Sequence, residues 1–243
     1  MRINNPLEKF GLRDVVSAFS MRQDGNMSLS YGDTRQSLGN RKKFLSAIGV
    51  DYRDLICARQ VHGKNVVYVT ETDKGSGALD YDSSVDQADG FLTDKRNLPI
   101  AILTADCLSV FIYDPATPAA GILHAGWRST EKNICGQAIN LMREKFGSKP
   151  DELVVGFGPS IRACCCKVEN DFKSNFPFGL ISREDGLFLD IALINTRQLL
   201  DCGVKEGNIF DPELCTFSQY KDFFSFRKEA ESAGRMISVI MIK

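Results

Sequence analysis

Short apolar runs dominate the middle of the chain. Each is six or seven residues long, is rich in Val, Ile, Leu or Phe, and is bounded by Gly, Pro or Asp. Runs of this length and composition predict β-strands, and their nearly continuous apolar character indicates strands buried on both faces. Six such strands are predicted at residues 55–61, 65–70, 99–104, 108–113, 119–124 and 152–157, and another at 236–241.

Three segments instead repeat their apolar side chains at the spacing of an α-helix. A glycine follows each segment, and two of them open with Asp or Asn, whose short polar side chains cap helix N-termini. The predicted helices cover residues 130–146 before Gly147, residues 190–202 from an Asp190 cap to Gly203, and residues 40–49 from an Asn40 cap to Gly49.

The connections between these elements predict the fold class. Residues 105–107 join two predicted strands, and so short a connection favours antiparallel pairing, whereas the strands that flank helix 130–146 could be parallel. The expected fold is therefore mixed, α/β or α+β, with helices outside a mixed sheet. The polar stretch 71–89 is expected to be a surface loop, and without repeats or long linkers we expect a single domain over residues 1–243.

Composition excludes several classes of protein. The chain of 243 residues is 43% hydrophobic, and its 30 Lys and Arg balance 31 Asp and Glu, so we expect no nucleic-acid partner. No apolar stretch approaches the length of a membrane span and the N-terminus lacks the apolar core of a signal peptide, so we expect no membrane association and a cytoplasmic location. The eight cysteines are expected to be reduced thiols.

The only two histidines of the chain lie at the ends of predicted strands, and so does one cysteine. They are His62 in Gln-Val-His-Gly, Cys107 in Thr-Ala-Asp-Cys and His124 in His-Ala-Gly-Trp-Arg. One thiolate and two imidazoles suit zinc and leave an open fourth position. The same residues could instead form a Cys-His nucleophilic pair, with Asp106 or Gln60 orienting the histidine. A third possibility is that each is a buried structural residue, and spacing alone does not discriminate among these alternatives.

The order and separation of these motifs resemble the YfiH-like laccase-domain family. The resemblance extends to Asn-Arg at 40–41, Gly-Pro-Ser-Ile with paired cysteines at 158–165, and Cys-Thr at 215–216 followed by Phe-Phe-Ser-Phe-Arg at 223–227. It implies a four-layer αββα sandwich with mixed sheets and a zinc site made of His62, Cys107 and His124. The implied activities are phosphorolysis of purine nucleosides, including methylthioadenosine, and deamination of adenosine. An older attribution for the family is a copper-dependent polyphenol oxidase, or laccase.

Three positions depart from the family pattern. The N-terminal region has Phe-Ser-Met-Arg at 19–22 and a polar run at 23–36 where the family has a glycine-rich loop. Ser129 follows the His-Ala-Gly-Trp-Arg motif where Gly is usual, and Cys166 replaces an aromatic residue. None of these changes affects a proposed metal ligand.

Further candidates follow from the chemistry. Proton transfer in deamination needs an acid or base, for which Asp106 is the candidate, with a hydrogen-bonded turn residue as the alternative. Phosphate needs guanidinium groups, and Arg41, Arg128 and Arg227 are candidates, with structural ion pairs as the alternative. Trp127 and four phenylalanines of the C-terminal region could line a pocket but are expected to be core: Phe217, Phe223, Phe224 and Phe226. Cys164, Cys165 and Cys166 could extend a metal site, but adjacent side chains in an extended segment alternate in direction, so buried thiols are expected.

The leading hypothesis is therefore a zinc-dependent purine nucleoside phosphorylase whose partners are purine nucleosides and phosphate. The alternatives are a Cys-His hydrolase or amidase acting on peptidoglycan precursors, and a module that uses zinc only for structure. A multicopper oxidase is disfavoured because two histidines cannot supply about ten mostly imidazole ligands. The sequence does not indicate the oligomeric state, the preferred nucleoside, or which of phosphorolysis and deamination dominates.

Overall fold

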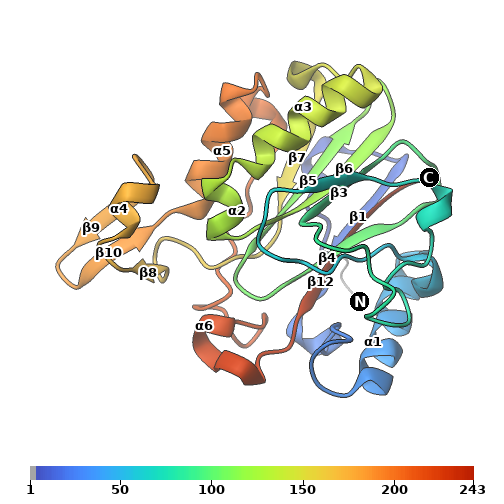
Figure 1. The fold of residues 1–243 in the computed structure, drawn as a ribbon, viewed down its shortest axis with the longest axis horizontal. Helices are drawn as coiled ribbons and strands as arrows, with labels where there is room; N and C mark the ends of the chain where they lie inside the picture. Colours follow the sequence, from blue (N-terminus) through green and yellow to red (C-terminus); the bar gives the residue numbers. More distant parts are fainter. Residues whose placement is uncertain (1–3) are drawn as a thin grey trace.

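Two β-sheets pack face to face between layers of helices in the computed structural model, which describes residues 4–243 (Figure 1). The larger sheet has the strand order β11-β7-β5-β6-β3-β2. The pairs among β7, β5, β6 and β3 are antiparallel, whereas β11 and β2 pair in parallel at the two edges, so the sheet is mixed. Its strands are β2 (Val66–Tyr68), β3 (Gly90–Thr93), β5 (Leu108–Asp114), β6 (Ala119–Ala125), β7 (Val154–Phe157) and β11 (Ile209–Phe210).

The smaller sheet, of order β1-β12-β4, is antiparallel throughout. It consists of β1 (Val15–Phe19), β12 (Met236–Ile242) and β4 (Ile100–Thr104). Helix α1 (Thr34–Ala47) covers its outer face. The outer face of the larger sheet is covered by α2 (Trp127–Glu131), α3 (Ile134–Phe146) and α5 (Ile191–Asp201).

Alternating side chains of the buried strands fill the spaces between these layers. In β5, Val110 and Ile112 pack against α3 and α5, whereas Phe111 and Tyr113 pack against the smaller sheet. A third apolar cluster joins the smaller sheet to α1, where Phe44 is buried. The layers therefore follow the order helix, sheet, sheet, helix, which confirms the αββα sandwich; the larger of its two sheets is mixed and the smaller is antiparallel.

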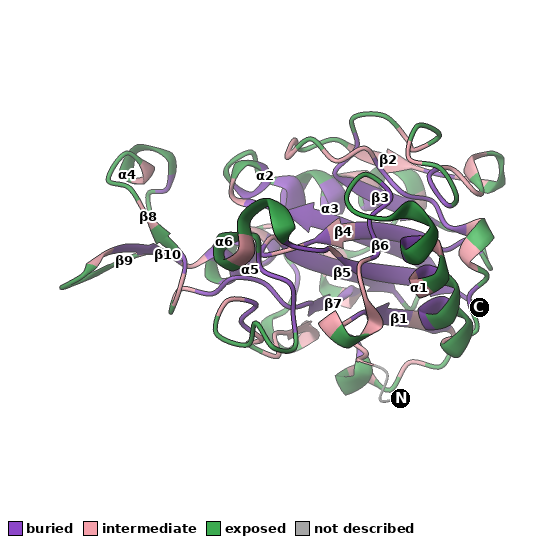
Figure 2. Ribbon diagram, turned by 90° about the horizontal axis from the view of Figure 1, so that it is seen from below, coloured by how far each residue is buried: buried purple, intermediate pink, exposed green. Residues whose placement is uncertain are grey.

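A small third sheet of order β8-β10-β9 projects from this body together with a short helix (Figure 2). Its elements, with the remaining short helix of the C-terminal region, are β8 (Lys167–Val168), α4 (Phe172–Asn175), β9 (Leu180–Arg183), β10 (Gly186–Leu189) and α6 (Phe226–Glu229). Single 3-10 turns lie at Glu8–Phe10, Arg22–Asp24, Tyr52–Asp54, Glu71–Asp73, Pro150–Glu152, Glu206–Asn208 and Ala230–Ser232. No helix within residues 4–243 is long and apolar enough to cross a membrane.

Two predicted helices differ in their boundaries from the structure, whereas α5 follows its Asp190 cap as predicted. The prediction of one continuous helix over residues 130–146 is wrong. Asn133 has a left-handed φ of 58°, and its Oδ1 accepts a hydrogen bond from Gly136 N at 3.0 Å. Asn133 therefore caps α3 and separates it from α2. Helix α1 begins well before Asn40, at an Asp33 cap that accepts a hydrogen bond from Gln36 N. Asn40 is therefore not the N-terminal cap of this helix but a polar residue inside it.

Two predictions about the strands are also wrong. Residues 55–61 are extended but form only isolated bridges, Ile56 with Ile100 and Ala58 with Val85. The strands on either side of residues 105–107 do not pair, because β4 belongs to the smaller sheet and β5 to the larger one. Asp106 adopts a φ of 87°, a left-handed conformation that lets this short connection cross between the sheets. We call residues 105–107 the crossover.

Candidate functional site

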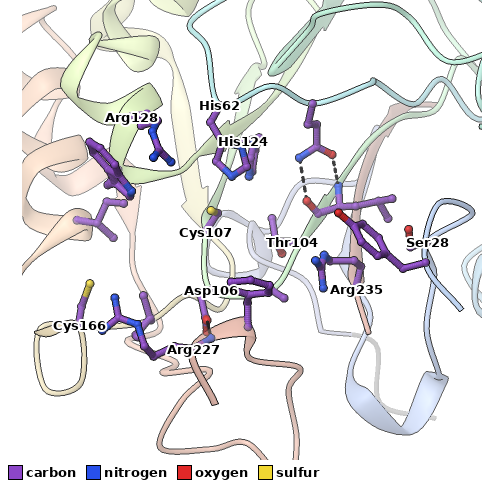
Figure 3. A pocket seen from close by; sticks show the side chains of 18 of the residues that line it. Ser28, His62, Thr104, Asp106, Cys107, His124, Arg128, Cys166, Arg227 and Arg235 are labelled. Atoms are coloured by element: carbon purple, nitrogen blue, oxygen red, sulfur yellow. Dashed lines mark hydrogen bonds between the residues drawn. The ribbon is translucent and has the colours of Figure 1, made fainter. Parts of the chain in front are cut away.

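A cavity of about 720 Å³ opens where the crossover, the end of β6 and the turn at residues 60–63 meet (Figure 3). This volume lies within the range of about 300–1,000 Å³ that is usual for small-molecule sites. His62, Cys107 and His124 all line the cavity, so the structure brings together the three residues that the sequence singled out. In Figure 3 the two histidine rings lie side by side above the sulfur of Cys107.

Three different segments bring these side chains together. His124 is buried near the end of β6, Cys107 completes the crossover, and His62 adopts a left-handed φ of 57° in its turn. One ligand atom of each residue lies within 4.8 Å of those of the other two. The ring centroids of His62 and His124 are 4.7 Å apart, with the rings inclined at 70°.

Asp89, which the sequence analysis missed, orients both histidines. Its Oδ1 lies 2.8 Å from His124 Nδ1 and also accepts a hydrogen bond from His62 N at 2.9 Å, while its Oδ2 accepts one from Gly63 N at 2.6 Å. The carboxylate is fully buried. Because Nδ1 of His124 is engaged, its Nε2 is free to act as a ligand, which is how a carboxylate usually fixes a metal-binding histidine. The only local signal was an acidic residue directly before the strand at 90–93.

The charges of this group favour a deprotonated sulfur. Burial acts to raise the pKa of Cys107, but the charge and hydrogen bond of His124 and the hydrogen bond of His62 outweigh it and lower the pKa to about 6. Burial acts to lower the pKa of His124, but the Cys107 thiolate and Asp89 raise it to about 9. Burial likewise opposes ionisation of Asp89, yet the hydrogen bond from His124 holds its pKa below the usual range. Near neutral pH and without a metal, the group therefore combines a Cys107 thiolate with a His124 imidazolium that is bonded to the Asp89 carboxylate.

These residues fit a zinc ion. In a tetrahedral site with bonds of about 2.0–2.3 Å, neighbouring donor atoms lie roughly 3.3–3.6 Å apart, a separation that small side-chain rotations reach from the observed arrangement. Gly126 keeps the space beside them open, because a Cβ there would lie 3.0 Å from Cys107 Sγ and 3.0 Å from His62 Cδ2. Three protein donors leave a fourth position toward the cavity, as in catalytic zinc sites.

Asp106 lines the cavity, but both of its carboxylate oxygens accept hydrogen bonds from the protein. Oδ1 accepts from Thr216 Oγ1 and Oδ2 from Arg227 N, each at 2.6 Å. These contacts are those of a hydrogen-bonded turn residue, which is the alternative to a role for Asp106 in proton transfer. Asp106 therefore holds the segment of Arg227 against the crossover.

The three arginines proposed for phosphate have different environments. Arg41 is 1% exposed, lies outside the cavity lining and donates to the carbonyl oxygens of Met27, Gly77 and Ala78, so the expectation that it binds substrate is corrected to a structural role. Arg128 lines the cavity with its guanidinium 4.2 Å from the ring centre of Trp127. No residue among 4–243 forms a hydrogen bond or ion pair with the Arg128 guanidinium. Arg227 also lines the cavity, with Nη1 bonded to Lys167 O.

Several other lining residues were absent from the sequence-based set. Arg235 lies across the cavity from Arg128 in Figure 3, with its guanidinium 4.5 Å from the ring centre of Tyr31. Thr104 is 2% exposed, and its Oγ1 has no hydrogen-bond partner within the described residues. Thr104 is the last residue of β4 and opens the Thr-Ala-Asp-Cys motif, whereas Arg235 directly precedes β12 and belongs to no motif. Gln60, a candidate for orienting a histidine, instead pairs with the main chain of Leu103.

The aromatic residues and the adjacent cysteines divide between core and surface. Phe223 and Phe224 are buried, as expected, whereas Trp127 and Phe226 line the cavity. Cys166 is buried and also lines the cavity. The expectation that Cys164 is a buried thiol is wrong, because its side chain is exposed at the surface, and Cys165 is half-buried.

Comparison with known proteins identifies relatives of this chain. The profile of the family described as multi-copper polyphenol oxidoreductase laccase matches residues 13–243. The chain is 32% identical over 249 residues to purine nucleoside phosphorylase YlmD of Bacillus subtilis (strain 168), and the aligned region covers 95% of this chain and 90% of that protein. It is 25% identical over 220 residues to adenosine deaminase RL5 of an unknown prokaryotic organism, covering 87% and 84% of the two chains.

A solved structure shows the same fold. The crystal structure of YlmD from Geobacillus stearothermophilus superposes with a TM-score of 0.91 at 28% identity, and the match covers 95% of this chain and 92% of that one. The chain therefore belongs to the laccase-domain family, whose profile is described as multi-copper polyphenol oxidoreductase laccase.

Proposed function

We propose that this protein is a zinc-dependent purine nucleoside phosphorylase. The observation that carries the proposal is the convergence of Cys107, His62 and His124, with Asp89 behind them, on a cavity that three arginines also line. The names of the relatives support this assignment, since YlmD of Bacillus subtilis is named a purine nucleoside phosphorylase. Deamination of adenosine is proposed as a second activity, supported by the name of adenosine deaminase RL5, and methylthioadenosine is proposed as a further substrate of phosphorolysis.

Zinc is the metal that these donors favour. One thiolate and two imidazoles form a mixed soft and borderline set, and His124 is held in the tautomer that presents Nε2. The chemistry that bound zinc supplies is Lewis acidity toward an oxygen or nitrogen of the substrate. A multicopper cluster remains disfavoured, because the whole sequence contains two histidines.

The cavity offers separate surroundings for a phosphate and a purine base. Arg128, Arg227 and Arg235 place positive charge around it, and the Arg128 guanidinium donates no hydrogen bond to any other residue among 4–243. Guanidinium groups bind phosphate through paired hydrogen bonds and would hold it against the sugar carbon. A purine would pack against the apolar part of the wall, which includes Trp127, Ile161, Phe172 and Ile191.

The first experiment identifies the products by liquid chromatography with mass detection. Zinc-loaded protein is incubated with adenosine, with and without phosphate. Adenine and ribose-1-phosphate are expected only when phosphate is present, and inosine is expected without it. Cys107→Ser should abolish all three products, whereas Cys202→Ser, at the half-buried end of α5, should retain them. The absence of any product from the zinc-loaded wild-type protein would overturn the proposal.

The role of Arg128 is tested separately. Loss of a charged hydrogen bond to phosphate costs about 1.5–3 kcal/mol, so Arg128→Ala should raise the KM for phosphate about tenfold or more. Arg197→Ala serves as the control, because Arg197 forms an exposed ion pair with Asp201 on the outer surface of α5. An unchanged KM for phosphate in Arg128→Ala would remove this residue from the phosphate site.

One observation favours a second candidate, a Cys-His hydrolase or amidase acting on peptidoglycan precursors. Cys107, His124 and Asp89 form a connected series in which His124 lowers the pKa of the thiol and Asp89 bonds the histidine, as in cysteine nucleophiles. Such an enzyme would hydrolyse amides without zinc and would lose activity when Cys107 is alkylated. Chelator-treated protein assayed on peptidoglycan-derived peptides distinguishes the two candidates, because a phosphorylase that depends on zinc is inactive there.

A further inference from the structure

Three cysteines form a cluster on the outer side of the cavity wall. Cys164 and Cys165 lie on the loop after β7, and Cys215 lies on the loop after β11. The sulfur of Cys164 is 3.6 Å from that of Cys215 and 3.3 Å from that of Cys165, and all three sulfurs lie within 4.8 Å of one another. We call these residues the thiol cluster. None of them lines the cavity, so the cluster is separate from the site of Cys107.

Main-chain and ion-pair contacts hold the two loops in register. Ser160 and Cys215 form an isolated parallel bridge, with Thr216 N donating to Ser160 O at 3.0 Å. Arg162 binds Asp211 through both terminal nitrogens at 2.7 and 2.5 Å, and its Nε donates to Leu214 O. The cluster is therefore assembled by the fold, and no further folding is needed to bring the sulfurs together.

The sulfurs differ in access and in ease of ionisation. Cys164 is exposed and Cys165 half-buried, so an ion can enter from solvent, whereas Cys215 is buried. Burial opposes ionisation of Cys215, but hydrogen bonds from Ser218 and the amide of Arg162 lower its pKa to about 7. Burial and the adjoining sulfur raise the pKa of Cys165 to about 12. Without a cation, Cys215 is the cysteine that ionises first, and Cys164 and Cys165 remain thiols. A cation that binds all three sulfurs would displace the protons of these two thiols.

A disulfide explains the arrangement less well. It would use two sulfurs and leave the third unexplained. Adjacent cysteines are also poor partners, because Cα atoms joined by a trans peptide are about 3.8 Å apart and a disulfide usually needs about 4.4 Å or more. The pair Cys164 and Cys215 is the remaining possibility, and it makes no use of Cys165.

We propose that the thiol cluster is a second metal site, which binds a thiophilic d10 cation through the sulfurs of Cys164, Cys165 and Cys215. Zn²⁺ and Cu⁺ share this preference for thiolate ligands. Metal–sulfur bonds of about 2.3 Å place three sulfurs roughly 3.8–4.0 Å apart, close to the arrangement of the cluster. Within the described residues, no additional His, Cys, Asp or Glu joins the group. The site therefore has three protein ligands, with water as any fourth.

The position of the cluster gives such an ion a defined structural effect. Cys166, which follows Cys165, lines the cavity, and Thr216, which follows Cys215, donates a hydrogen bond to Asp106. A cation bound to the cluster would therefore join the loop that lines the cavity through Cys166 to the loop whose Thr216 holds Asp106. We expect metal binding here to raise the melting temperature of the protein even when the site of Cys107 is disabled.

The test counts metal in protein that lacks the cavity site. Full-length Cys107→Ser protein is loaded with Zn²⁺ in one arm and with Cu⁺ under anaerobic reducing conditions in the other, dialysed, and analysed by inductively coupled plasma mass spectrometry. One equivalent per chain is expected to remain in at least one arm, and the arm that retains it identifies the cation. X-ray absorption of that sample should show three sulfur ligands.

The variants show whether the cluster holds this metal. Adding Cys164→Ser and Cys165→Ser, which replace the two sulfurs nearer the surface, should remove the equivalent and the gain in melting temperature. Adding Cys202→Ser instead should change neither, and circular dichroism verifies that each variant is folded. Equal metal content in all variants, or no retained metal in Cys107→Ser, would overturn the proposal. A Cys164–Cys215 disulfide in protein that binds no metal under reducing conditions would also overturn it.

Discussion

Asp89 is the residue whose loss should reveal most about the cavity site. It bonds His124 Nδ1 and the amide of His62, so Asp89→Asn keeps the size of the side chain but removes its charge. Loss of such a partner typically costs 10–100-fold in metal affinity or activity, and we expect about that loss of zinc affinity. Asp82→Asn, at a side chain that is 89% exposed, is the control. Unchanged zinc affinity in competition with a chelator would show that Asp89 does not orient the ligands.

The Cys107 thiol should be reactive at unusually low pH when the protein carries no metal. The histidines lower its pKa to about 6, so its alkylation by iodoacetamide should reach half its maximal rate near that pH. As the pH falls below this value, the thiolate is protonated and the rate declines. Cys202, whose pKa is raised by burial, is the internal reference and should reach half its maximal rate at a clearly higher pH than Cys107. Peptide mass spectrometry after timed alkylation measures both cysteines, and a Cys107 profile matching that of Cys202 would contradict the described electrostatics.

Arg41 was proposed to bind phosphate because it is an arginine, but its surroundings are those of a structural residue. It lies outside the cavity and donates to three carbonyl oxygens, and leaving buried acceptors unpaired costs about 1–3 kcal/mol each. Arg41→Ala should therefore lower the free energy of unfolding by at least about 3 kcal/mol, measured by urea denaturation. The KM for phosphate of the folded variant should be unchanged. A stable variant with a raised KM would restore Arg41 to the phosphate site.

At the scale of elements, the site depends on the crossover between the sheets and on the glycine that starts α2. Gly126 has no room for a side chain, because an added Cβ would meet Cys107 Sγ and His62 Cδ2 at 3.0 Å. Its φ of −70° is open to any residue, so Gly126→Ala should fold. We expect at least tenfold weaker zinc binding in this variant, measured by chelator competition. The control is Gly39→Ala, on the exposed side of α1 with nothing near its Cβ. Equal zinc affinity in the two variants would show that Gly126 does not keep the ligand space open.

The elements that local patterns specify were predictable, and those set by tertiary context were not. The buried strands β5 and β6 and the capped helix α5 follow from apolar runs and an Asp cap. The break at Asn133 was missed because the predicted helix begins at Thr130, and the polar residues 130–133 contain no signal that separates α2 from α3. The short connection at residues 105–107 predicts antiparallel pairing, because its length alone does not show that the two strands belong to different sheets.

The candidate site was predictable to a similar extent. Strand ends and the rarity of histidine identified His62, Cys107 and His124 as candidates, the family resemblance implied that they form one site, and the structure brings them together. Asp89 was missed because it precedes its strand without any motif and meets His124, 35 residues away, only in the fold. A metal site at residues 164–166 is the less favoured alternative in the sequence, and the participation of Cys215 was missed because it lies 51 residues beyond Cys164.

At the scale of the whole molecule, the layers explain why the site has one wall built on the sheets and another built on loops. The larger sheet and the crossover fix His124 and Cys107, whereas the projecting β8-β10-β9 sheet, the loop after β7 and α6 supply lining residues on the outer side (Figure 1). Functional groups on a rigid scaffold with variable surrounding loops are typical of binding sites. The departures from the family pattern near residues 19–36 include Ser28, Ser30 and Tyr31 of the lining, so they bear on substrate choice.

The central claim is that zinc held by His62, Cys107 and His124 is required for phosphorolysis. The most direct test titrates Zn²⁺ into metal-free Cys164→Ser, Cys165→Ser protein, in which the cavity group is the remaining candidate site among the described residues, and follows adenine release from adenosine in phosphate. We expect the rate to rise in proportion to bound zinc and to level off at one equivalent per chain, with no rise in protein that also carries Cys107→Ser. Full activity before zinc is added, or a rise that Cys107→Ser does not abolish, would contradict the account.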